Sequence, residues 1–396
     1  MLKKIRGSAL QFTVIISVVI FIILGTFLLL AFTYSKLNDR TSNVIRNIYK
    51  AQDIIVKYSN NRLDTNQKEE KIEKTYWGGF EKVVSKSGEG IDSFLRAALL
   101  GTEISRELPR LYLADQNIPL VLAGRTKIAG DIFVPGKFVK PGSVAGEYFQ
   151  GTKLVHGQVF KSQKDLPELE GGWLNYIDSI FSKKSIVQAN IKEENVQNSF
   201  LQNELILVDN SGVLDYNLKG NVVLFSSKPI LIKRSASIDQ ILIVAPKIKT
   251  ESGFVGSFHA ITNIFESDTD CHFEYPSSVT TLKEDSENFN SIVIKAGTRF
   301  EGNLISLNPS NISNNSEGIL INEDSEVLGF IYCEGDIEFY GKIRGSIYAN
   351  KVLTEKKGSK YLNHLFSCTI TDENLPITIA GPVLRDSEKT IASWLY

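Results

Sequence analysis

The 396-residue chain has little cysteine and methionine, and each shortage excludes a class of site. The three cysteines contain no CxxC spacing, which excludes a zinc ribbon and argues against a small disulfide-stapled module. A pairing of Cys271 with Cys368 is compatible with export, and three buried thiols, including Cys333, are the alternative. The single methionine excludes a methionine-rich adaptable binding surface.

The net charge and the missing sequence motifs exclude further classes of function. The formal net charge is −1, and no long basic block follows the N-terminus. The clustered basic footprint of a nucleic-acid-binding protein is therefore missing. The G-x-S-x-G elbow, the P-loop, HExxH and GxGxxG are also absent, and these motifs mark hydrolases, nucleotide-binding proteins and metalloproteases. We therefore expect neither enzymatic activity nor a bound cofactor.

One long apolar run extends from Phe12 to Phe32, directly behind the basic residues Lys3, Lys4 and Arg6. A bilayer core is crossed by about 20 apolar helical residues, and the basic flank predicts a cytoplasmic N-terminus. We therefore expect a single-pass anchor in the inner (cytoplasmic) membrane, with the rest of the chain periplasmic or extracellular. A cleaved secretory signal is the alternative, although its apolar part is shorter, at about 7–15 residues.

The helical pattern continues beyond the apolar run, since neither proline nor glycine occurs between Thr26 and Asn61. Apolar residues spaced by three and four predict one helix from about Ser8 to Ser59, and they are Leu37, Val44, Ile45, Ile48, Ala51, Ile54, Ile55 and Tyr58. This stripe packs either on the chain's own body or against neighbouring helices. The N-terminal part therefore comprises a basic leader, a transmembrane helix and an exported stalk, at residues 1–7, 8–34 and 35–62.

From about Leu111 the helical pattern gives way to short β-branched and aromatic runs. A phrase of the form x-Gly-x-apolar recurs there, most clearly as LGFIY at 328–332 and RGSIY at 344–348. Glycine suits strand corners, and repeats of this kind stack as coils. The fold class predicted for residues 111–396 is mainly β, a β-solenoid like a right-handed parallel β-helix. An antiparallel barrel or sandwich is the alternative. The two phrases align Val327, Phe330 and Tyr332 with Ile343, Ser346 and Tyr348.

Two stretches carry apolar residues at helical spacing. Residues 63–110 are predicted to be a mixed, partly helical segment beside the stalk, from Trp77, Phe80, Val83, Val84, Phe94, Leu95, Ala98 and Leu99. Residues 165–204 are predicted to be a helical insertion into the β-rich body, from Leu174, Ile177, Ile180 and Phe181.

The best candidate for a metal site is DTDCH at 268–272, which gathers Asp268, Asp270, Cys271 and His272. Oxygen ligands suit Ca²⁺, and a Cys–His pair suits a softer metal. A polar corner between two strands is the simpler interpretation, so no metal site is predicted.

The best candidate for glycan chemistry is the alternating trio Glu334, Asp336 and Glu338, because paired carboxylates cleave glycosidic bonds. The nearby aromatic residues suited to stacking on sugars are Tyr332, Phe339, Tyr340 and Tyr348. A solvated strand face with Ile337 and Phe339 pointing inward is the simpler interpretation. We therefore predict no catalytic residues.

The N-terminal string MLKKIRGSALQFTVIISVV resembles a type III (prepilin-type) leader, as in type IV pilins and the minor pseudopilins of type II secretion. The resemblance implies cleavage between Gly7 and Ser8. It also implies one long helix, half in the membrane and half against a β-rich head. Major pilins carry Glu at the fifth mature position, where this chain has Phe12, and tip-class minor subunits often lack that Glu. The head here is also far larger than a usual pilin head.

Residues of about 290–355 resemble a bactofilin-type β-helix, in IVIKAGTRFEGNLISL and EVLGFIYCEGDIEFYGKIRGSIYANKV. Bactofilins are cytoskeletal polymers without enzymatic activity. This chain departs from them in its anchor and expected export, so this resemblance supports the fold alone. The apolar run and the leader resemblance predict a membrane-anchored exported structural protein, a minor pilin- or pseudopilin-like subunit of a bacterial envelope or secretion assembly. Its expected partners are the lipid bilayer and other envelope subunits, reached through the stalk. A solenoid that binds or cleaves envelope polysaccharide and a plain anchored scaffold are the alternatives.

Overall fold

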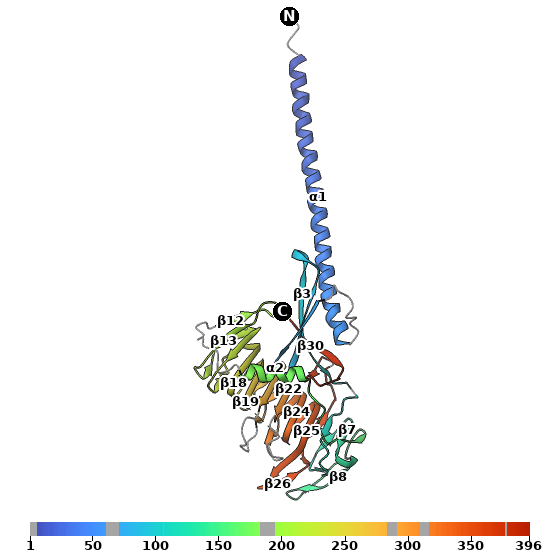
Figure 1. Cartoon of the computed structure of the whole chain (residues 1–396), viewed down its shortest axis with the longest axis vertical. Coiled ribbons are helices and arrows are strands. Elements are labelled where there is room, and N and C mark those ends of the chain that lie inside the picture. The colour runs from blue at the N-terminus through green and yellow to red at the C-terminus, as the bar shows by residue number, and fades with distance from the viewer. Residues whose placement is uncertain are drawn as a thin grey trace.

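The computed structural model of the chain describes residues 6–60, 71–105, 107–182, 195–282, 291–308, 317–376 and 378–396. It contains one long helix, α1 (Arg6–Ser59), a small antiparallel sheet and a large body of mostly parallel strands (Figure 1). The N-terminal half of α1 extends away from the rest of the chain, and its C-terminal end lies beside the sheet. The single long helix predicted from about residue 8 to residue 59 is confirmed.

The small sheet is built from two distant parts of the chain. Its strands are β1 (Lys71–Trp77), β2 (Phe80–Ser87), β3 (Phe94–Glu103), β29 (Ala380–Gly381) and β30 (Lys389–Leu395). Neighbouring strands are antiparallel, and β2, β29 and β30 all pair with β3. We call α1 with these five strands the helix–sheet unit.

The prediction of a partly helical segment at residues 63–110 is wrong for its described residues. They form β1 to β3 and a 3-10 turn, η1 (Gly90–Asp92). The two-residue turn Gly78–Gly79 folds β1 onto β2 and places Trp77 opposite Phe80, as Gly-Gly loops do in hairpins. Both faces of β2 are covered, with Val83 against α1 and Phe80 against the body. The alternation of a strand was therefore hidden, because apolar residues occupy both of its faces.

The described residues between Leu111 and Thr371 form what we call the parallel body. Its helix is α2 (Gly171–Ser182), its 3-10 turn is η2 (Pro135–Lys137), and its strands are β4 (Leu111–Leu113), β5 (Leu120–Ala123), β6 (Lys127–Ile128), β7 (Ile132–Val134), β8 (Val139–Pro141), β9 (Ser143–Val144), β10 (Glu147–Tyr148), β11 (Val159–Lys161), β12 (Asn195–Asn198), β13 (Leu205–Val208), β14 (Val213–Leu214), β15 (Asn217–Gly220), β16 (Val222–Phe225), β17 (Ile230–Ile232), β18 (Ile238–Thr250), β19 (Val255–Glu266), β20 (His272–Leu282), β21 (Ile292–Ile294), β22 (Arg299–Leu307), β23 (Glu317–Ile321), β24 (Glu326–Phe339), β25 (Lys342–Lys356), β26 (Ser359–Leu362), β27 (His364–Phe366) and β28 (Thr369–Thr371).

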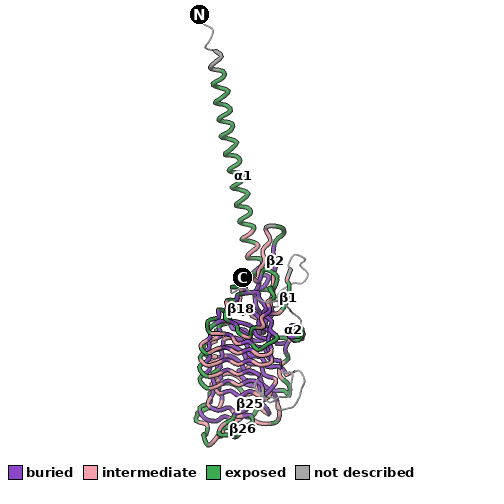
Figure 2. Tube along the Cα trace, turned by 90° about the vertical axis from the view of Figure 1, so that its left-hand side faces the viewer, coloured by how far each residue is buried: buried purple, intermediate pink, exposed green. Residues whose placement is uncertain are grey.

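Most strands of the body join one sheet that closes on itself. The long strands β18, β19, β20, β22, β24 and β25 pair in parallel, each with the next. Figure 2 shows the successive turns of the chain stacked below α1. The alignment predicted from the two glycine phrases is confirmed, because β24 places Val327, Phe330 and Tyr332 opposite Ile343, Ser346 and Tyr348 of β25.

A column of three glycines runs through this stack. Gly302 of β22 pairs with Gly329 of β24, which pairs with Gly345 of β25. Their φ values are +141°, +145° and +145°, a region that side chains disfavour. A Cβ atom on Gly345 would also overlap the carbonyl oxygen of Gly329. Each of these strands can therefore approach the next only because glycine occupies this position.

The structure has three main apolar clusters. The largest fills the inside of the parallel body. A second lies between the small sheet and the parallel body, including α2, and it contains Trp77, Trp173 and Phe330. The third lies between α1 and the other face of the sheet, and it contains Ile55 and Val83. The small sheet is thus covered on both faces.

The predicted helical insertion at residues 165–204 is shorter than expected. Helix α2 covers Gly171–Ser182 and buries Trp173, Ile177, Ile180 and Phe181. Residues 183–194 lie outside the described part of the chain, and Asn195–Asn198 form strand β12. The helical spacing therefore predicts the three turns of α2 correctly, but the predicted helical region was too long.

The possible pairing of Cys271 with Cys368 does not form, and the alternative of three buried thiols is confirmed. All three cysteines are free and buried, and all three belong to the apolar cluster inside the body. Burial raises the pKa of the Cys333 and Cys368 thiols to about 12, which keeps these two side chains in the unreactive thiol form. The cysteines therefore act as small apolar core residues.

Candidate functional site

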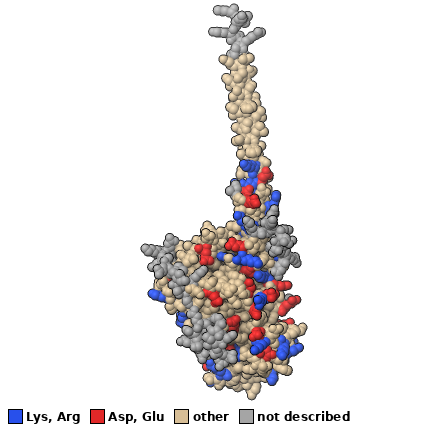
Figure 3. Space-filling model, viewed as in Figure 1, with Lys and Arg blue, Asp and Glu red and all other residues tan. Residues whose placement is uncertain are grey.

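The most distinctive surface of the molecule is the N-terminal part of α1. Every residue from 10 to 43 is exposed, and the helix is long and apolar enough to cross a membrane. Figure 3 shows that this part carries no Lys, Arg, Asp or Glu side chain before the stalk begins. Its hydroxyl groups donate to helix carbonyls three or four residues earlier, as bilayer-compatible polar groups do, and they belong to Thr13, Ser17, Thr26 and Thr33.

The residues of the predicted leader site lie at the start of α1. Gly7, Ser8 and Phe12 are all in its first turns, and Phe12 is 65 % exposed. No carboxylate occurs among the first thirty residues of the helix. The surface of the helix from Leu10 to Ser35 is therefore uncharged.

The predicted stalk stripe packs on the chain's own sheet at its C-terminal end. Ala51, Ile54 and Ile55 are buried, and Ile55 contacts the cluster that contains Ala98 and Leu100 of β3. Other apolar residues of the stalk remain exposed, namely Leu37, Ile45, Tyr49 and Val56. One face of the stalk thus packs against the sheet of the same chain, and another face is exposed.

A buried polar cluster closes the joint between α1 and the sheet. Tyr58 donates its hydroxyl to Glu81 Oε1 at 2.5 Å, and Lys389 Nζ lies 2.5 Å from Glu81 Oε2. Glu81 is only 3 % exposed. Burial and the Glu81 carboxylate raise the pKa of Tyr58, which keeps its hydroxyl a donor. We call Tyr58, Glu81 and Lys389 the clasp, because they join α1, β2 and β30.

Removing the carboxylate of the clasp is expected to loosen this joint. Glu81→Gln should lower the free energy of unfolding by about 2–4 kcal/mol, because Lys389 keeps its charge in a largely buried place without its counter-ion. Urea unfolding of the detergent-solubilised chain measures this change. Asp53→Asn is the matched control, since it breaks an exposed pair with Lys57 and should cost below about 0.5 kcal/mol. Equal effects of the two substitutions would contradict a structural role for the clasp.

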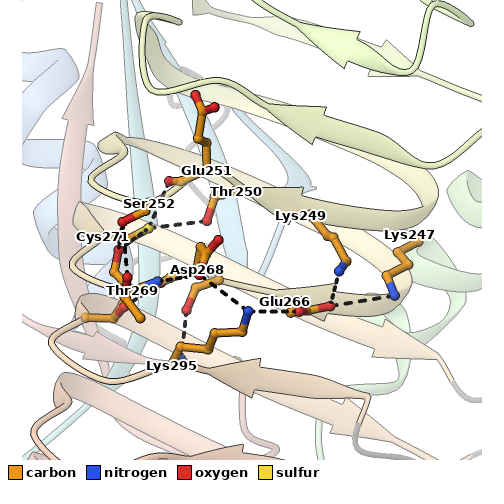
Figure 4. Close-up of polar contacts among 12 residues, drawn as sticks. Lys247, Lys249, Thr250, Glu251, Ser252, Glu266, Asp268, Thr269, Cys271 and Lys295 are labelled. Carbon is orange, nitrogen blue, oxygen red and sulfur yellow. Dashed lines mark hydrogen bonds and ion pairs between the residues drawn. The ribbon is translucent and has the colours of Figure 1, made fainter.

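The structure places DTDCH at the corner between β19 and β20, where the side chains of Asp268 and Cys271 have different partners (Figure 4). Asp268 Oδ1 lies 3.4 Å from Lys295 Nζ, which also pairs with Glu266 at 3.2 Å. The Cys271 thiol donates to the Glu251 carbonyl at 3.3 Å. Among the described residues, no three His, Cys, Asp or Glu side chains gather in a way that could hold a metal ion. The corner is built from internal polar contacts.

The structure does not bring the three candidate carboxylates together around one hollow. Glu334 lines a hollow of about 470 Å³ beside α2, which neither Asp336 nor Glu338 lines. Its Oε2 accepts the backbone N–H of Asn308 at 2.7 Å, and burial raises the pKa of Glu334. Glu338 instead accepts a hydrogen bond from Tyr340 at 3.1 Å.

The aromatic residues near this trio belong mainly to the packed interior. Tyr332, Phe339 and Tyr348 are at most 3 % exposed, and the Tyr332 hydroxyl donates to the Pro167 carbonyl at 3.1 Å. Ile337 and Phe339 point inward as predicted. These three rings are therefore not available as an open stacking platform for sugars.

Sequence reasoning missed the clasp and the Gly78–Gly79 turn. The turn had a readable signal, because Gly-Gly between apolar runs marks a hairpin. The clasp had none, since its residues lie far apart in the chain. Comparisons with protein-family models, curated proteins and solved structures found no match to this chain. The proposed function therefore rests on the geometry of α1 and of the sheet and body that follow it.

Proposed function

We propose that this chain is a membrane-anchored, exported structural subunit of a bacterial envelope assembly, of the minor pilin or pseudopilin type. The observation that carries the proposal is the division of α1. Its N-terminal part is apolar and exposed, whereas its C-terminal part packs on an antiparallel sheet. The membrane holds the first part, and the second part fixes the body at a set distance from it.

The orientation in this proposal follows from charge. Lys3, Lys4 and Arg6 precede the apolar segment and keep the N-terminus cytoplasmic. The body then lies on the outer side of the inner membrane. The exposed stalk residues Ile45, Tyr49 and Val56 are spaced by four and seven, which places them on one side of the helix. That side is open to a neighbouring subunit.

The proposal also treats the parallel body as a β-solenoid. Two observations support a solenoid over a simple barrel. Equivalent positions recur at short sequence intervals, as with Leu242 opposite His259 and Gly329 opposite Gly345. In addition, β24 pairs with β22 and β23 on one side and with β25 on the other, so one continuous strand crosses two faces of a coil. A solenoid offers a long repetitive surface and suits a structural role.

Processing of the N-terminus tests the pilin-like form of the proposal. Mass spectrometry of the membrane-extracted chain is expected to find a mature protein that begins at Ser8. Gly7→Leu should leave the leader attached, because the site implied by the resemblance needs a small residue. Gly25→Ala should not affect processing, since nothing lies within 4 Å of the added methyl group. An intact N-terminus in the parent chain, or cleavage beyond Thr33, would reject the pilin-like form and leave an anchored scaffold.

A further inference from the structure

The hollow of about 470 Å³ beside α2 is built where distant parts of the chain meet. The strands β24 and β25 contribute Tyr332, Glu334 and Asn350 to its lining, and residues 165–174, which lead into α2, contribute a second set. The Asn350 amide donates to the backbone carbonyl of Glu334 and so ties the two strands together at this point. Arg385, which follows the parallel body, also lines the hollow.

The lining combines apolar and acidic side chains. Three leucines line the hollow, namely Leu166, Leu169 and Leu174. Three carboxylates line it as well, namely Asp165, Glu168 and Glu334. Arg385, the one cation among the described lining residues, pairs with Glu168 and donates its backbone N–H to the Glu168 carbonyl at 2.8 Å. Three carboxylates and one guanidinium leave the lining with a surplus of two negative charges.

Glu334 is the carboxylate whose charge is left unbalanced. Its Oε2 accepts the backbone N–H of Asn308 at 2.7 Å, and no described residue bonds its Oε1 or brings a cation to it. Glu266, a partly buried carboxylate elsewhere on the body, instead has Lys249 Nζ at 2.7 Å. Burial raises the pKa of Glu334, as expected where no cation offsets the loss of water. One oxygen of a partly buried carboxylate is thus left to accept a hydrogen bond from a ligand.

These properties select the chemistry of the ligand. A single free oxygen suits one N–H donor of an ammonium group better than the paired donors of a guanidinium. The leucine side chains suit the carbon chain of an amine, which packs on apolar surface while its charged end meets an acid. A divalent metal ion takes several oxygen ligands, and the described part of the chain holds no group of three His, Cys, Asp or Glu side chains suited to one.

We propose that the hollow beside α2 binds a primary alkylammonium group, with Glu334 as the acceptor of its N–H and the three leucines around its carbon chain. A lysine side chain of a partner protein and a free diamine both carry this group. The site belongs to the parallel body, so the proposal holds whatever assembly the anchor serves.

The probe is n-butylammonium, added to the full chain in micelles of a nonionic detergent. Saturation-transfer NMR is expected to detect binding with a Kd of about 1–10 mM, the range open to a ligand of few atoms. The alcohol n-butanol has the same carbon chain without the charge and should bind about tenfold more weakly or less, because it cannot form a charge-assisted hydrogen bond. The probe n-butylguanidinium should not bind more tightly than n-butylammonium.

Two variants locate the binding site. Glu334→Gln keeps an acceptor for the Asn308 N–H but removes the charge, and it should weaken n-butylammonium binding about tenfold or more. Asp165→Asn is the matched control, because Asp165 lines the same hollow at an exposed position and should change the Kd by less than about threefold. Equal losses in the two variants would show a general attraction to negative charge and would overturn the proposal. If Glu334→Gln does not fold, the comparison with n-butanol on the parent chain decides.

Two larger probes distinguish the sources of the ammonium group. Cadaverine represents a free diamine, and the peptide acetyl-Gly-Lys-Gly-amide represents a lysine of a partner protein. The probe that binds more tightly identifies the source, since both carry the same group. Failure of n-butylammonium to bind, equal binding of n-butanol, or an unchanged Kd in Glu334→Gln would overturn the proposal. None of these results bears on processing at Ser8, so the two proposals fail separately.

Discussion

The double substitution Val19→Arg and Ile23→Arg is expected to release the protein from the membrane fraction. Both side chains are exposed on α1, so the change leaves the packing of the body intact. An arginine near the centre of a spanning helix costs about 2.5–3.5 kcal/mol, and two on one side of the helix should reduce insertion by about 10⁴-fold. Fractionation after a carbonate wash measures the share of protein that remains in the membrane.

The control places the same two charges outside the apolar segment. Asn38→Arg and Ser42→Arg keep the spacing of four and also occupy exposed positions on α1. This variant should stay in the membrane fraction. If both variants remain bound after the wash, another part of the molecule holds the protein at the membrane, and the anchoring role of α1 is wrong.

Gly345→Ala is expected to be the most damaging single substitution in the parallel body. The new methyl group would overlap the carbonyl oxygen of Gly329, and φ of +145° is itself unfavourable for alanine. β25 pairs in register with β24 along the glycine column, so a local shift would break this pairing. We expect a loss of at least about 3 kcal/mol in the free energy of unfolding, measured by urea titration of the β signal.

Gly358→Ala separates the two causes of this loss. Gly358 also has a positive φ, of +75°, but nothing lies within 4 Å of its added methyl group. Backbone strain alone should then cost about 1–2 kcal/mol. If the two variants lose similar stability, close contact between strands at the glycine column is not the role of Gly345.

The parts of this fold that the sequence predicts are those encoded by local repetition. An uninterrupted apolar run and a stripe without glycine or proline were enough to predict α1. The repeated glycine phrase was enough to predict which residues of β24 and β25 face each other. The hairpin of β1 and β2 was misread because both faces of β2 are covered, so apolar residues at 77, 80, 83 and 84 imitate helical spacing.

The joints between the parts could not be predicted in the same way. The clasp depends on Lys389, which reaches Glu81 only because β30, which follows the whole parallel body in the sequence, pairs with β3 of the small sheet. His259 is a single histidine in an apolar strand, and nothing near it in the sequence indicates that the Gly78–Gly79 turn covers it. Both features arise from contacts between segments that are remote in the chain, and local patterns carry no record of such contacts.

The place where the body leaves and rejoins the small sheet has a consequence for its size. Glu103, at the end of β3, pairs directly with Ala380 at the start of β29, so the body is a loop whose two ends meet. Insertion or removal of whole strand repeats between β3 and β29 would therefore leave the contact of α1 with the small sheet in place. A repeat of the length that separates Gly329 from Gly345 would change the reach of the far end of the body by about 4.8 Å, the spacing of neighbouring strands.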